Sequence, residues 1–474
     1  MLTRIYHSLP HWARTSAGTL YGYYLHSWRY GPHTEKYVQE AFEREHWDLE
    51  RTLEYQSGLL QSVLHRAATQ VPYYRAMWSA RRRSGDHSSW NVLSNWPVLE
   101  KDEVRSNARA FVAEDVRISQ LHRSQTSGTS GKPLELWQTR DSLREWYGLM
   151  EARWRRWYGV SSGDRWAMLG GQLVVPVSQT KPPFWIWNHA FRQLYMSSYH
   201  LSDELIPSYL EAMRKYKVTY VWGYTSALYT LARFILNHRG TPIRLKVAIT
   251  NAEPMNAVQR DVISRAFDCP VRETYGMSEM VTAASECEYG RLHMWPRVGV
   301  VEVIDGGVTR ESGSGELICT GLLNSAMPLI RYRIGDRGTL APHDYVCECG
   351  RSLPTLLSVE GRVDDVLYTP TGRQVGRMDP VFKADLPVRE AQIIQRCLTS
   401  VDVDVVPDSS WTADAGRDIA ARVRERLGDI DVNIRLVERI PRGPNGKFRA
   451  VICEVGAEEL RRCATGAARQ EARA

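Results

Sequence analysis

Apolar residues recur at helical spacing in the first part of the chain. Leu49, Leu53, Leu60 and Leu64 lie four or seven positions apart, a spacing that places their side chains on one face of an α-helix. The pattern predicts amphipathic helices from Glu35 to Ala80, within a helical lead-in over residues 1–80.

Beyond the lead-in, short apolar runs alternate with longer segments of helical periodicity. The predicted strands are Arg165–Gly171, Thr219–Gly223, Leu245–Thr250 and Val271–Tyr275, and the predicted helices between them are Asp203–Tyr216, Ser226–His238 and Asn256–Phe267. This alternation predicts an α/β fold with layered, mostly parallel sheets, in which ligands lie at the carboxyl ends of the strands.

After Cys349 the pattern changes to that of a smaller α+β unit. Its predicted elements are strands at Ala391–Cys397, Val401–Val406 and Asn433–Val437 and a helix at Ala413–Leu427. We place the boundary at Asp364, which gives a large N-terminal domain over 1–363 and a small, mobile C-terminal domain over 364–474.

Composition narrows the class of protein. The 474 residues are 43% hydrophobic and 24% charged, with a net charge of +7. Basic and acidic residues interleave without a long basic stripe, which argues against a nucleic-acid partner. No run approaches the roughly 18 apolar residues that span a bilayer, so we expect no membrane span and a cytoplasmic location.

The first thirty residues are rich in aromatic side chains, among them Trp12, Tyr21, Tyr23, Tyr24 and Trp28. Such a segment fits either an interfacial membrane contact or a helix packed on the main body or on a second subunit. We favour the packed helix, and packing on a second subunit would make the protein a homodimer.

A hydroxyl- and glycine-rich loop at Ser124–Pro133 has the chemistry of a phosphate cradle. Glycines let backbone N–H groups approach an anion, and a lysine supplies positive charge. The loop residues that suit this role are Thr126, Ser127, Gly128, Thr129, Ser130, Gly131 and Lys132. Pro133 stands where an ordinary P-loop carries the hydroxyl that binds magnesium, and the other reading of the loop is a solvated turn between strands.

Four further segments follow this loop in order. They are Glu273–Glu279, Arg331–Asp336, Gly361–Asp365 and Pro441–Lys447. Together the five segments resemble the adenylate-forming superfamily of acyl-CoA synthetases, luciferases and peptide-synthetase adenylation domains. Three others, Asn251–Pro254, Ala68–Arg75 and Cys347–Arg351, resemble its phenylacetate-CoA ligase branch, especially the homologues encoded among capsule and surface-polysaccharide biosynthesis genes.

The resemblance implies ATP and Mg²⁺ as co-substrate and cofactor. The phosphate loop would hold the β- and γ-phosphates, Tyr275 would lie along the adenine, and Asp336 would accept hydrogen bonds from the ribose. Ser278 and Glu279 would meet the α-phosphate and magnesium, for which a carboxylate oxygen is a suitable ligand. The remaining residues implied at the nucleotide are Ala252, Glu253, Pro254, Glu273, Thr274, Gly276 and Arg362.

The same resemblance assigns catalytic roles. Lys447 would bridge the carboxylate substrate and the α-phosphate, while Arg362 and Glu279 would complete the catalytic set. Asp364 would be the hinge about which the small domain rotates between half-reactions. Each of these residues taken alone is an ordinary surface or turn residue, and their joint occurrence in order favours the enzyme.

Three cysteines and a histidine invite a metal interpretation: Cys287, His293, Cys347 and Cys349. Thiolate and imidazole ligands suit zinc, and four protein ligands would make the site structural. The other interpretation is that Cys287 and His293 are unrelated surface and core residues near a strand.

The partners would be a small carboxylic acid and an acyl acceptor. Coenzyme A is the acceptor by the branch resemblance, but Tyr368–Gly376 lacks the Gly-x-Asn-Val-Phe-Pro pattern of phenylacetate-CoA ligases. An amine or hydroxyl acceptor is therefore the alternative, and an inactive nucleotide-binding homologue is a third. Aromatic residues including Trp187 and Trp222 fit either an acyl pocket or the core.

Overall fold

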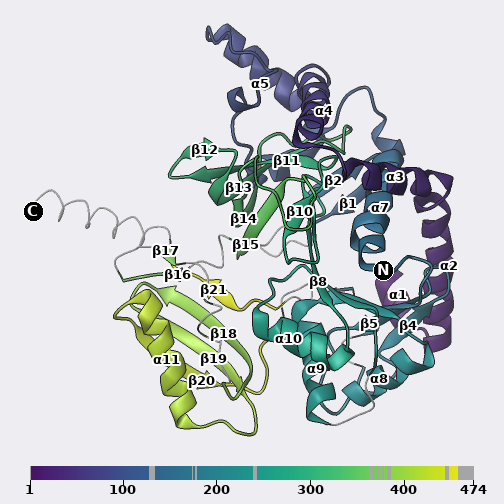
Figure 1. Ribbon diagram of the computed structural model, residues 1–474, viewed down its shortest axis with the longest axis vertical. Helices are drawn as coiled ribbons and strands as arrows, with labels where there is room; N and C mark the ends of the chain where they lie inside the picture. The colour runs from purple at the N-terminus through teal and green to yellow at the C-terminus, as the bar shows by residue number, and fades with distance from the viewer. Residues whose placement is uncertain are drawn as a thin grey trace, which may run out of the picture. The chain divides into compact units, whose positions relative to one another are not determined.

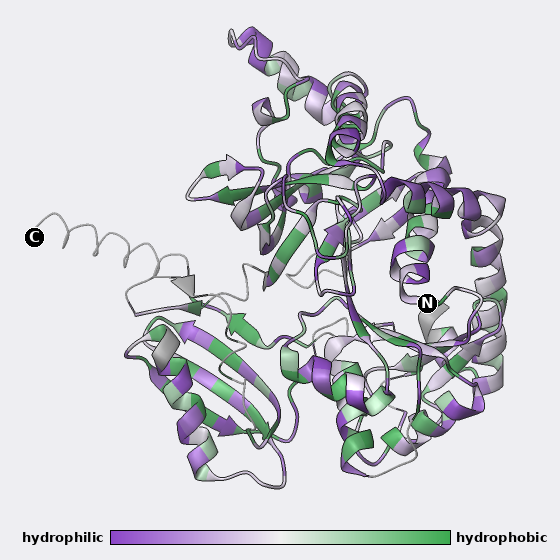
Figure 2. Ribbon diagram, viewed as in Figure 1, coloured by the Kyte–Doolittle hydropathy of each residue, from purple (hydrophilic) through white to green (hydrophobic). Residues whose placement is uncertain are grey.

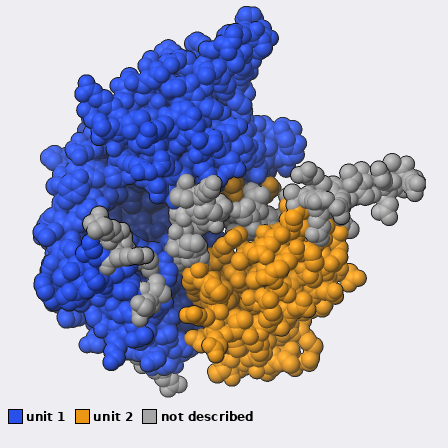
Figure 3. All heavy atoms as spheres, turned by 180° about the vertical axis from the view of Figure 1, so that it is seen from behind, with its two compact units in different colours: residues 1–334, 338–359 blue, residues 335–337, 360–474 orange. Residues whose placement is uncertain are grey.

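The computed structural model describes residues 2–126, 134–172, 174–176, 179–238, 243–362, 367–370, 374–375, 378, 381, 386–442 and 448–456. The chain divides into two compact units (Figure 3). The first comprises residues 1–334 and 338–359, and the second comprises 335–337 and 360–474. The predicted boundary at Asp364 lies outside the described residues and stays a prediction.

Five helices open the first unit (Figure 1). They are α1 (Leu2–Ser8), α2 (His11–Arg29), α3 (Pro32–Arg44), α4 (Leu49–Gln70) and α5 (Pro72–Arg83). Asp48 caps the start of α4, because its carboxylate accepts a hydrogen bond from the Arg51 N–H group, and such N-caps satisfy a donor that the helix leaves free. Val71 is the C-cap of α4 and directly precedes the proline that starts α5.

The centre of the first unit is a group of five parallel strands. They are β3 (Trp166–Gly170), β5 (Gln193–Ser197), β6 (Tyr220–Tyr224), β7 (Val247–Asn251) and β8 (Val271–Gly276), with helices α8 (Ile206–Lys215), α9 (Thr225–Asn237) and α10 (Ala257–Phe267) between strands. Strand β6 is buried along its whole length, as expected of a parallel strand covered on both faces. The predicted α/β fold is confirmed.

Antiparallel strands extend this sheet to thirteen strands. At one end β4 (Trp185–Asn188) pairs with β5. At the other end follow β9 (Ala283–Glu286), β10 (Leu292–Met294), β11 (Gly299–Asp305), β12 (Val308–Arg310), β13 (Gly313–Gly321), β14 (Tyr332–Leu340) and β15 (Thr355–Arg362). The hairpin β1 (His122–Gln125) and β2 (Glu135–Gln138) and helices α6 (Lys101–Ser106) and α7 (Arg140–Trp154) complete the unit.

Helix α2 packs on the main body, as the sequence predicted. Thr19 Oγ1 donates to the carbonyl of Trp187 on β4, and Asn188 Nδ2 donates to the carbonyl of Gly18. The approach is close at Gly22, where a Cβ atom would lie 2.4 Å from the Asn188 side chain. The opposite face of α2 exposes Trp12 and several tyrosines, and the homodimer stays a prediction. Among the described residues, no helix has both the length and the apolar character needed to cross a bilayer.

The second unit is a small α+β arrangement. Its elements are β16 (Leu367–Tyr368), β17 (Gln374–Val375), β18 (Val388–Cys397), β19 (Ser400–Pro407), α11 (Ala413–Leu427), β20 (Asp431–Leu436) and β21 (Val451–Cys453). The sheet order is β20-β19-β18-β21, and α11 packs its apolar face, with Ile419 and Val423, on that sheet. Figure 2 shows hydrophobic and hydrophilic positions alternating along these strands, the pattern of a sheet with one buried face.

Candidate functional site

The predicted nucleotide motifs begin at the carboxyl ends of β7 and β8. These strands are parallel neighbours, with Thr250 opposite Glu273. The turn that contains Ala252, Glu253 and Pro254 follows β7, and Tyr275 and Gly276 end β8. Two segments that lie more than twenty residues apart in sequence therefore leave the sheet at the same edge, where ligands of parallel sheets bind.

Glu279 lies in the turn after β8 and is held from two directions. Its Oε1 atom accepts hydrogen bonds from Lys101 Nζ at 3.2 Å and from the Tyr332 hydroxyl at 3.3 Å. The side chain is only 8% exposed. Its second oxygen, Oε2, has no hydrogen-bond partner in the described part of the chain. A carboxylate with one oxygen anchored and one available is a suitable donor set for Mg²⁺.

Backbone strain marks the same region. Ala252 has φ 62°, Met280 has φ 54° and Arg331 has φ 48°, all in the left-handed region that side chains with a Cβ rarely adopt. Ala252 follows β7, Met280 follows Glu279, and Arg331 precedes Tyr332. Strained residues concentrate where a site must be shaped, so this clustering agrees with the position of the predicted motifs.

Strands β1 and β2 flank the segment that the sequence predicts to be a phosphate loop. Thr126 is buried, its N–H group donates to the Leu134 carbonyl, and its hydroxyl accepts from the Leu134 N–H group, both at 3.0 Å. Thr126 therefore closes the base of the loop. The other predicted loop residues, Ser127 to Lys132, lie outside the described residues.

Gln138 connects this hairpin to the turn after β8. Its Nε2 atom donates to the Ser278 carbonyl at 3.2 Å, and its Oε1 atom accepts from the Ser124 hydroxyl at 3.1 Å. The side chain is buried. One amide thus fixes the phosphate-loop hairpin relative to the segment that contains Ser278 and Glu279.

Glu253 caps a helix with its carboxylate. Helix α9 has no capping side chain at its own N-cap residue, Tyr224. The Ser226 N–H group donates to Glu253 Oε2 at 2.8 Å, and the Ser226 hydroxyl donates to Oε1 at 3.1 Å. Its negative charge at the positive end of the helix is stabilising, and this bonding holds the Ala252–Pro254 turn against α9.

Glu273 has an unusual electrostatic environment. Burial, together with the nearby Glu286 carboxylate, raises the pKa of Glu273 to about 7, although Arg260 opposes the shift. Arg260 pairs with Glu286 at 2.7 Å and lies 3.8 Å from Glu273, so the shared cation is closer to the other carboxylate. The side chain of Thr274 points away from this group and donates to the Thr250 carbonyl.

Replacing Glu273 with glutamine is expected to stabilise the protein at high pH. An unfolded glutamate loses its proton near 4.5 and the folded one near 7, so the wild-type protein loses stability as the pH rises between these values. At about 1.4 kcal/mol per pKa unit, the variant should gain up to about 3 kcal/mol at pH 8. Urea unfolding at pH 4.5 and pH 8 measures the difference, and an equal effect at both values would contradict the assignment.

The remaining predicted residues lie on or beyond β14 and β15. Asp336 is half-buried on β14. Arg362 ends β15, and its side chain is not among those described. Asp364 and Lys447 lie outside the described residues. The roles of all four stay predictions.

The predicted metal ligands come together from two distant segments. The donor atoms of Cys287, His293, Cys347 and Cys349 all lie within 4.8 Å of one another. Cys287 Sγ is 3.8 Å from Cys347 Sγ, and Cys349 Sγ is 3.2 Å from His293 Nε2. Thiolates about 2.3 Å from a zinc ion at tetrahedral corners stand about 3.8 Å apart, so the cluster has the dimensions of such a site.

A hydrogen bond to a neighbouring residue fixes the orientation of the His293 ring. The Thr355 hydroxyl donates to the Leu353 carbonyl at 2.9 Å, so its oxygen accepts from His293 Nδ1, 3.1 Å away. The proton is then on Nδ1, and the Nε2 lone pair points toward the cysteines. A second hydrogen bond of this kind normally fixes the tautomer of a metal-binding histidine. The Gly350 N–H group donates to the Cys347 carbonyl and closes the turn that contains Cys349, and Gly350 has φ 75°.

Comparison with known proteins agrees with this geometry. Residues 367–454 match the CapK C-terminal domain. Protein CapK of Staphylococcus aureus is 26% identical over 391 residues, 80% of this chain and 84% of CapK. Phenylacetate-coenzyme A ligase of Aromatoleum evansii is 27% identical over 372 residues, 72% of this chain and 76% of that enzyme. The chain is a homologue of CapK and of the phenylacetate-CoA ligases.

The fold of this CapK homologue is also that of a solved adenylate-forming ligase. A 2-hydroxyisobutyryl-CoA ligase, solved in the postadenylation state with 2-HIB-AMP, superimposes with a TM-score of 0.65 at 22% identity. The match covers 89% of this chain and 93% of the ligase. The branch and the class of AMP-forming ligases inferred from the motifs are confirmed.

Sequence reasoning missed three residues that position the site: Lys101, Gln138 and Tyr332. Lys101 is 178 positions from the carboxylate that it holds, and Gln138 is 140 positions from Ser278. Their local sequence gives no signal of these contacts. Tyr332 lies within the Arg331–Asp336 motif, but the motif predicts a role only for Asp336.

Proposed function

We propose that the chain joins a small carboxylic acid to the α-phosphate of ATP and then transfers the acyl group to coenzyme A. A carboxylate oxygen attacks the α-phosphorus, the bond to the β-phosphate oxygen breaks, and pyrophosphate leaves. The thiol sulfur then attacks the acyl carbon, the bond to the AMP oxygen breaks, and the thiol proton passes to solvent. Relatives that are phenylacetate-CoA ligases support this reaction.

The observation that carries the proposal is the arrangement of Glu279. Glu279 lies in the turn after β8, whose neighbouring strand β7 leads into the Ala252–Pro254 turn. Lys101 and Tyr332 hold one of its carboxylate oxygens, and the other oxygen is available. Mg²⁺, when bound there, would offset the charge of the phosphates. Gln138 holds the hairpin of β1 and β2 beside the turn that contains Ser278 and Glu279. Catalysis of this kind is mainly alignment and neutralisation of charge.

Pyrophosphate release from ATP and Mg²⁺ tests the first half-reaction. A panel of aryl, fatty, hydroxy and amino acids is tested with the wild-type protein and with Lys447→Ala. We expect release with one class of acid and its loss in the variant, because the ammonium group would bridge the two reactants. An ATP-binding protein that releases no pyrophosphate with any acid would instead be an inactive homologue.

A second acceptor class has its own support. The second unit matches the CapK C-terminal domain, and Tyr368–Gly376 lacks the pattern of phenylacetate-CoA ligases. An amine or hydroxyl acceptor, as in an amide or ester ligase of polysaccharide or secondary-metabolite biosynthesis, is therefore the alternative. AMP release that depends on coenzyme A favours the first acceptor. Release that depends on an amine or a sugar hydroxyl favours the second.

The cysteine and histidine cluster adds a structural component to the proposal. We propose that Cys287, His293, Cys347 and Cys349 hold one zinc ion. Four protein ligands leave no position for a substrate, so the ion would join the turn between β9 and β10 to the segment before β15. It would stabilise the first unit and take no part in the acyl transfer.

A further inference from the structure

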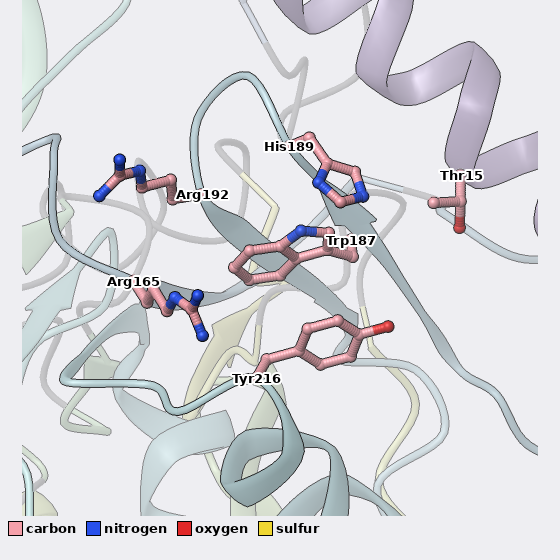
Figure 4. Close-up of a pocket in the computed structure, with 6 residues that line it drawn as sticks. All are labelled: Thr15, Arg165, Trp187, His189, Arg192 and Tyr216. Carbon is pink, nitrogen blue, oxygen red and sulfur yellow. The ribbon is translucent and has the colours of Figure 1, made fainter.

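A cavity of about 470 Å³ opens in the first unit, away from the predicted motifs. We call it the basic cavity, and Figure 4 shows its lining. The residues that line it are Thr15, Arg165, Trp187, His189, Arg192 and Tyr216. Trp187 lies at the centre, with the two arginines on one side and Thr15 of α2 on the other.

The basic cavity lies at the amino-terminal edge of the parallel strands. Arg165 directly precedes β3, Arg192 directly precedes β5, and Tyr216 follows α8 on the way to β6. The predicted nucleotide motifs leave the opposite edge. Strands of five residues at about 3.3 Å per residue separate the two edges by about 15 Å, so the cavity is distinct from the predicted nucleotide site.

The charge of the lining is positive, and one of its two guanidinium groups is engaged, since Arg192 Nη1 donates to the Gly163 carbonyl at 2.8 Å. None of the six lining residues is acidic. Within the described ranges, the exposed Arg165 guanidinium has no ion pair or hydrogen bond. The His189 ring meets only the edge of Trp187, with centroids 6.0 Å apart. The ammonium group of Lys215, 5.9 Å from the Tyr216 ring, adds to the positive charge nearby.

A buried hydroxyl and an aromatic wall complete the cavity. Thr15 Oγ1 is buried and has no hydrogen-bond partner among the described residues, although buried polar groups are normally bonded. Trp187 and Tyr216 stack with centroids 4.6 Å apart and planes 12° from parallel. The sequence left Trp187 open between an acyl pocket and the core, and the structure buries it in a hydrophobic core cluster, with 7% of its surface exposed at this edge.

Two basic residues on the segments that carry the cavity have left-handed backbone conformations. Arg192 has φ 48° at the end of the hairpin between β4 and β5, and Lys217 has φ 51° after α8. Both positions are ones where glycine is usual, because it alone adopts this conformation without cost. Here each carries a basic side chain.

We propose that the basic cavity binds a small phosphate ester that carries a ring, such as a sugar phosphate. Guanidinium and imidazole groups are the preferred partners of a phosphate, and Thr15 supplies a hydroxyl. The stacked aromatic wall suits the face of a ring, and the volume is in the range of small-molecule sites. The site is a binding site outside the ligase reaction.

Calorimetric titration with glucose 1-phosphate tests the proposal, with glucose and inorganic phosphate as comparison ligands. We expect glucose 1-phosphate to bind more tightly than either. Arg165→Gln should weaken its binding about tenfold, because it removes a charge-assisted hydrogen bond, and His189→Ala should weaken it as well, because it removes the imidazole ring from the lining. Arg83→Gln, which removes an equally exposed guanidinium at the end of α5, should leave the affinity unchanged.

The outcomes separate the cavity from the ligase. No binding of glucose 1-phosphate, or binding that neither cavity variant weakens, would overturn the site. Equal affinity for inorganic phosphate and glucose 1-phosphate would contradict the proposal that the ligand carries a ring. The titration contains neither ATP nor a carboxylic acid substrate, so its result is independent of the ligase activity. In the pyrophosphate assay, Arg165→Gln should behave as the wild type does.

Discussion

Replacing Glu279 with glutamine is expected to lower the rate of pyrophosphate release by about 10²-fold or more. Glutamine has the shape of glutamate and still accepts a hydrogen bond from the Tyr332 hydroxyl, but it has no negative charge for Mg²⁺. Lys101, which pairs with Glu279 at 3.2 Å, would also leave an uncompensated positive charge beside the metal position. Measuring the rate against Mg²⁺ concentration should show a weaker apparent affinity for the metal.

A matched control separates the metal role from the ion pair. Glu145 on α7 is also largely buried and pairs with Arg297 at 2.6 Å, away from the predicted motifs. Glu145→Gln should lower the melting temperature while leaving the Mg²⁺ dependence unchanged. A Glu279→Gln protein with the wild-type Mg²⁺ dependence would show that the carboxylate serves only its contacts with Lys101 and Tyr332.

Four of the five parallel strands, β3, β6, β7 and β8, were predicted from the sequence, whereas β5 was not. Strands β6 and β7 are largely apolar and buried, as expected of parallel strands covered on both faces, and α10 begins with the capping pair Asn256 and Gln259. The antiparallel half was not predicted. Strand β10 has three residues, and β14 contains a glycine pair around Asp336 and Arg337, so their pairing depends on distant partners rather than on local pattern.

The same distinction between local pattern and distant contacts applies to the site residues. Residues that share a short motif, such as Tyr275 and Ser278, were predicted together because their positions follow from the end of one strand. The anchors of Glu279 were not, because the fold alone brings Lys101 next to it. The basic cavity shows the limit most clearly, since its six residues share no motif and come from α2, from β4 and the turn after it, and from the residues that follow α8 or precede β3 and β5.

The purified protein is expected to contain about one zinc ion per chain, which elemental analysis by mass spectrometry can measure. The double variant Cys347→Ser and Cys349→Ser removes two ligands and should lose the metal. Zinc binding free energy in a structural site adds directly to folding free energy, so the melting temperature should fall by on the order of 5 °C or more.

Cys269→Ser provides the control for that loss. Cys269 is buried but lies outside the cluster, so its replacement should alter stability slightly and leave the zinc content at one per chain. Because the ion would have four protein ligands, the zinc-free variant that remains folded should keep its affinity for acid and ATP. Purified wild-type protein without zinc, or a double variant with the wild-type melting temperature, would show that the four side chains are packed together as an ordinary buried cluster.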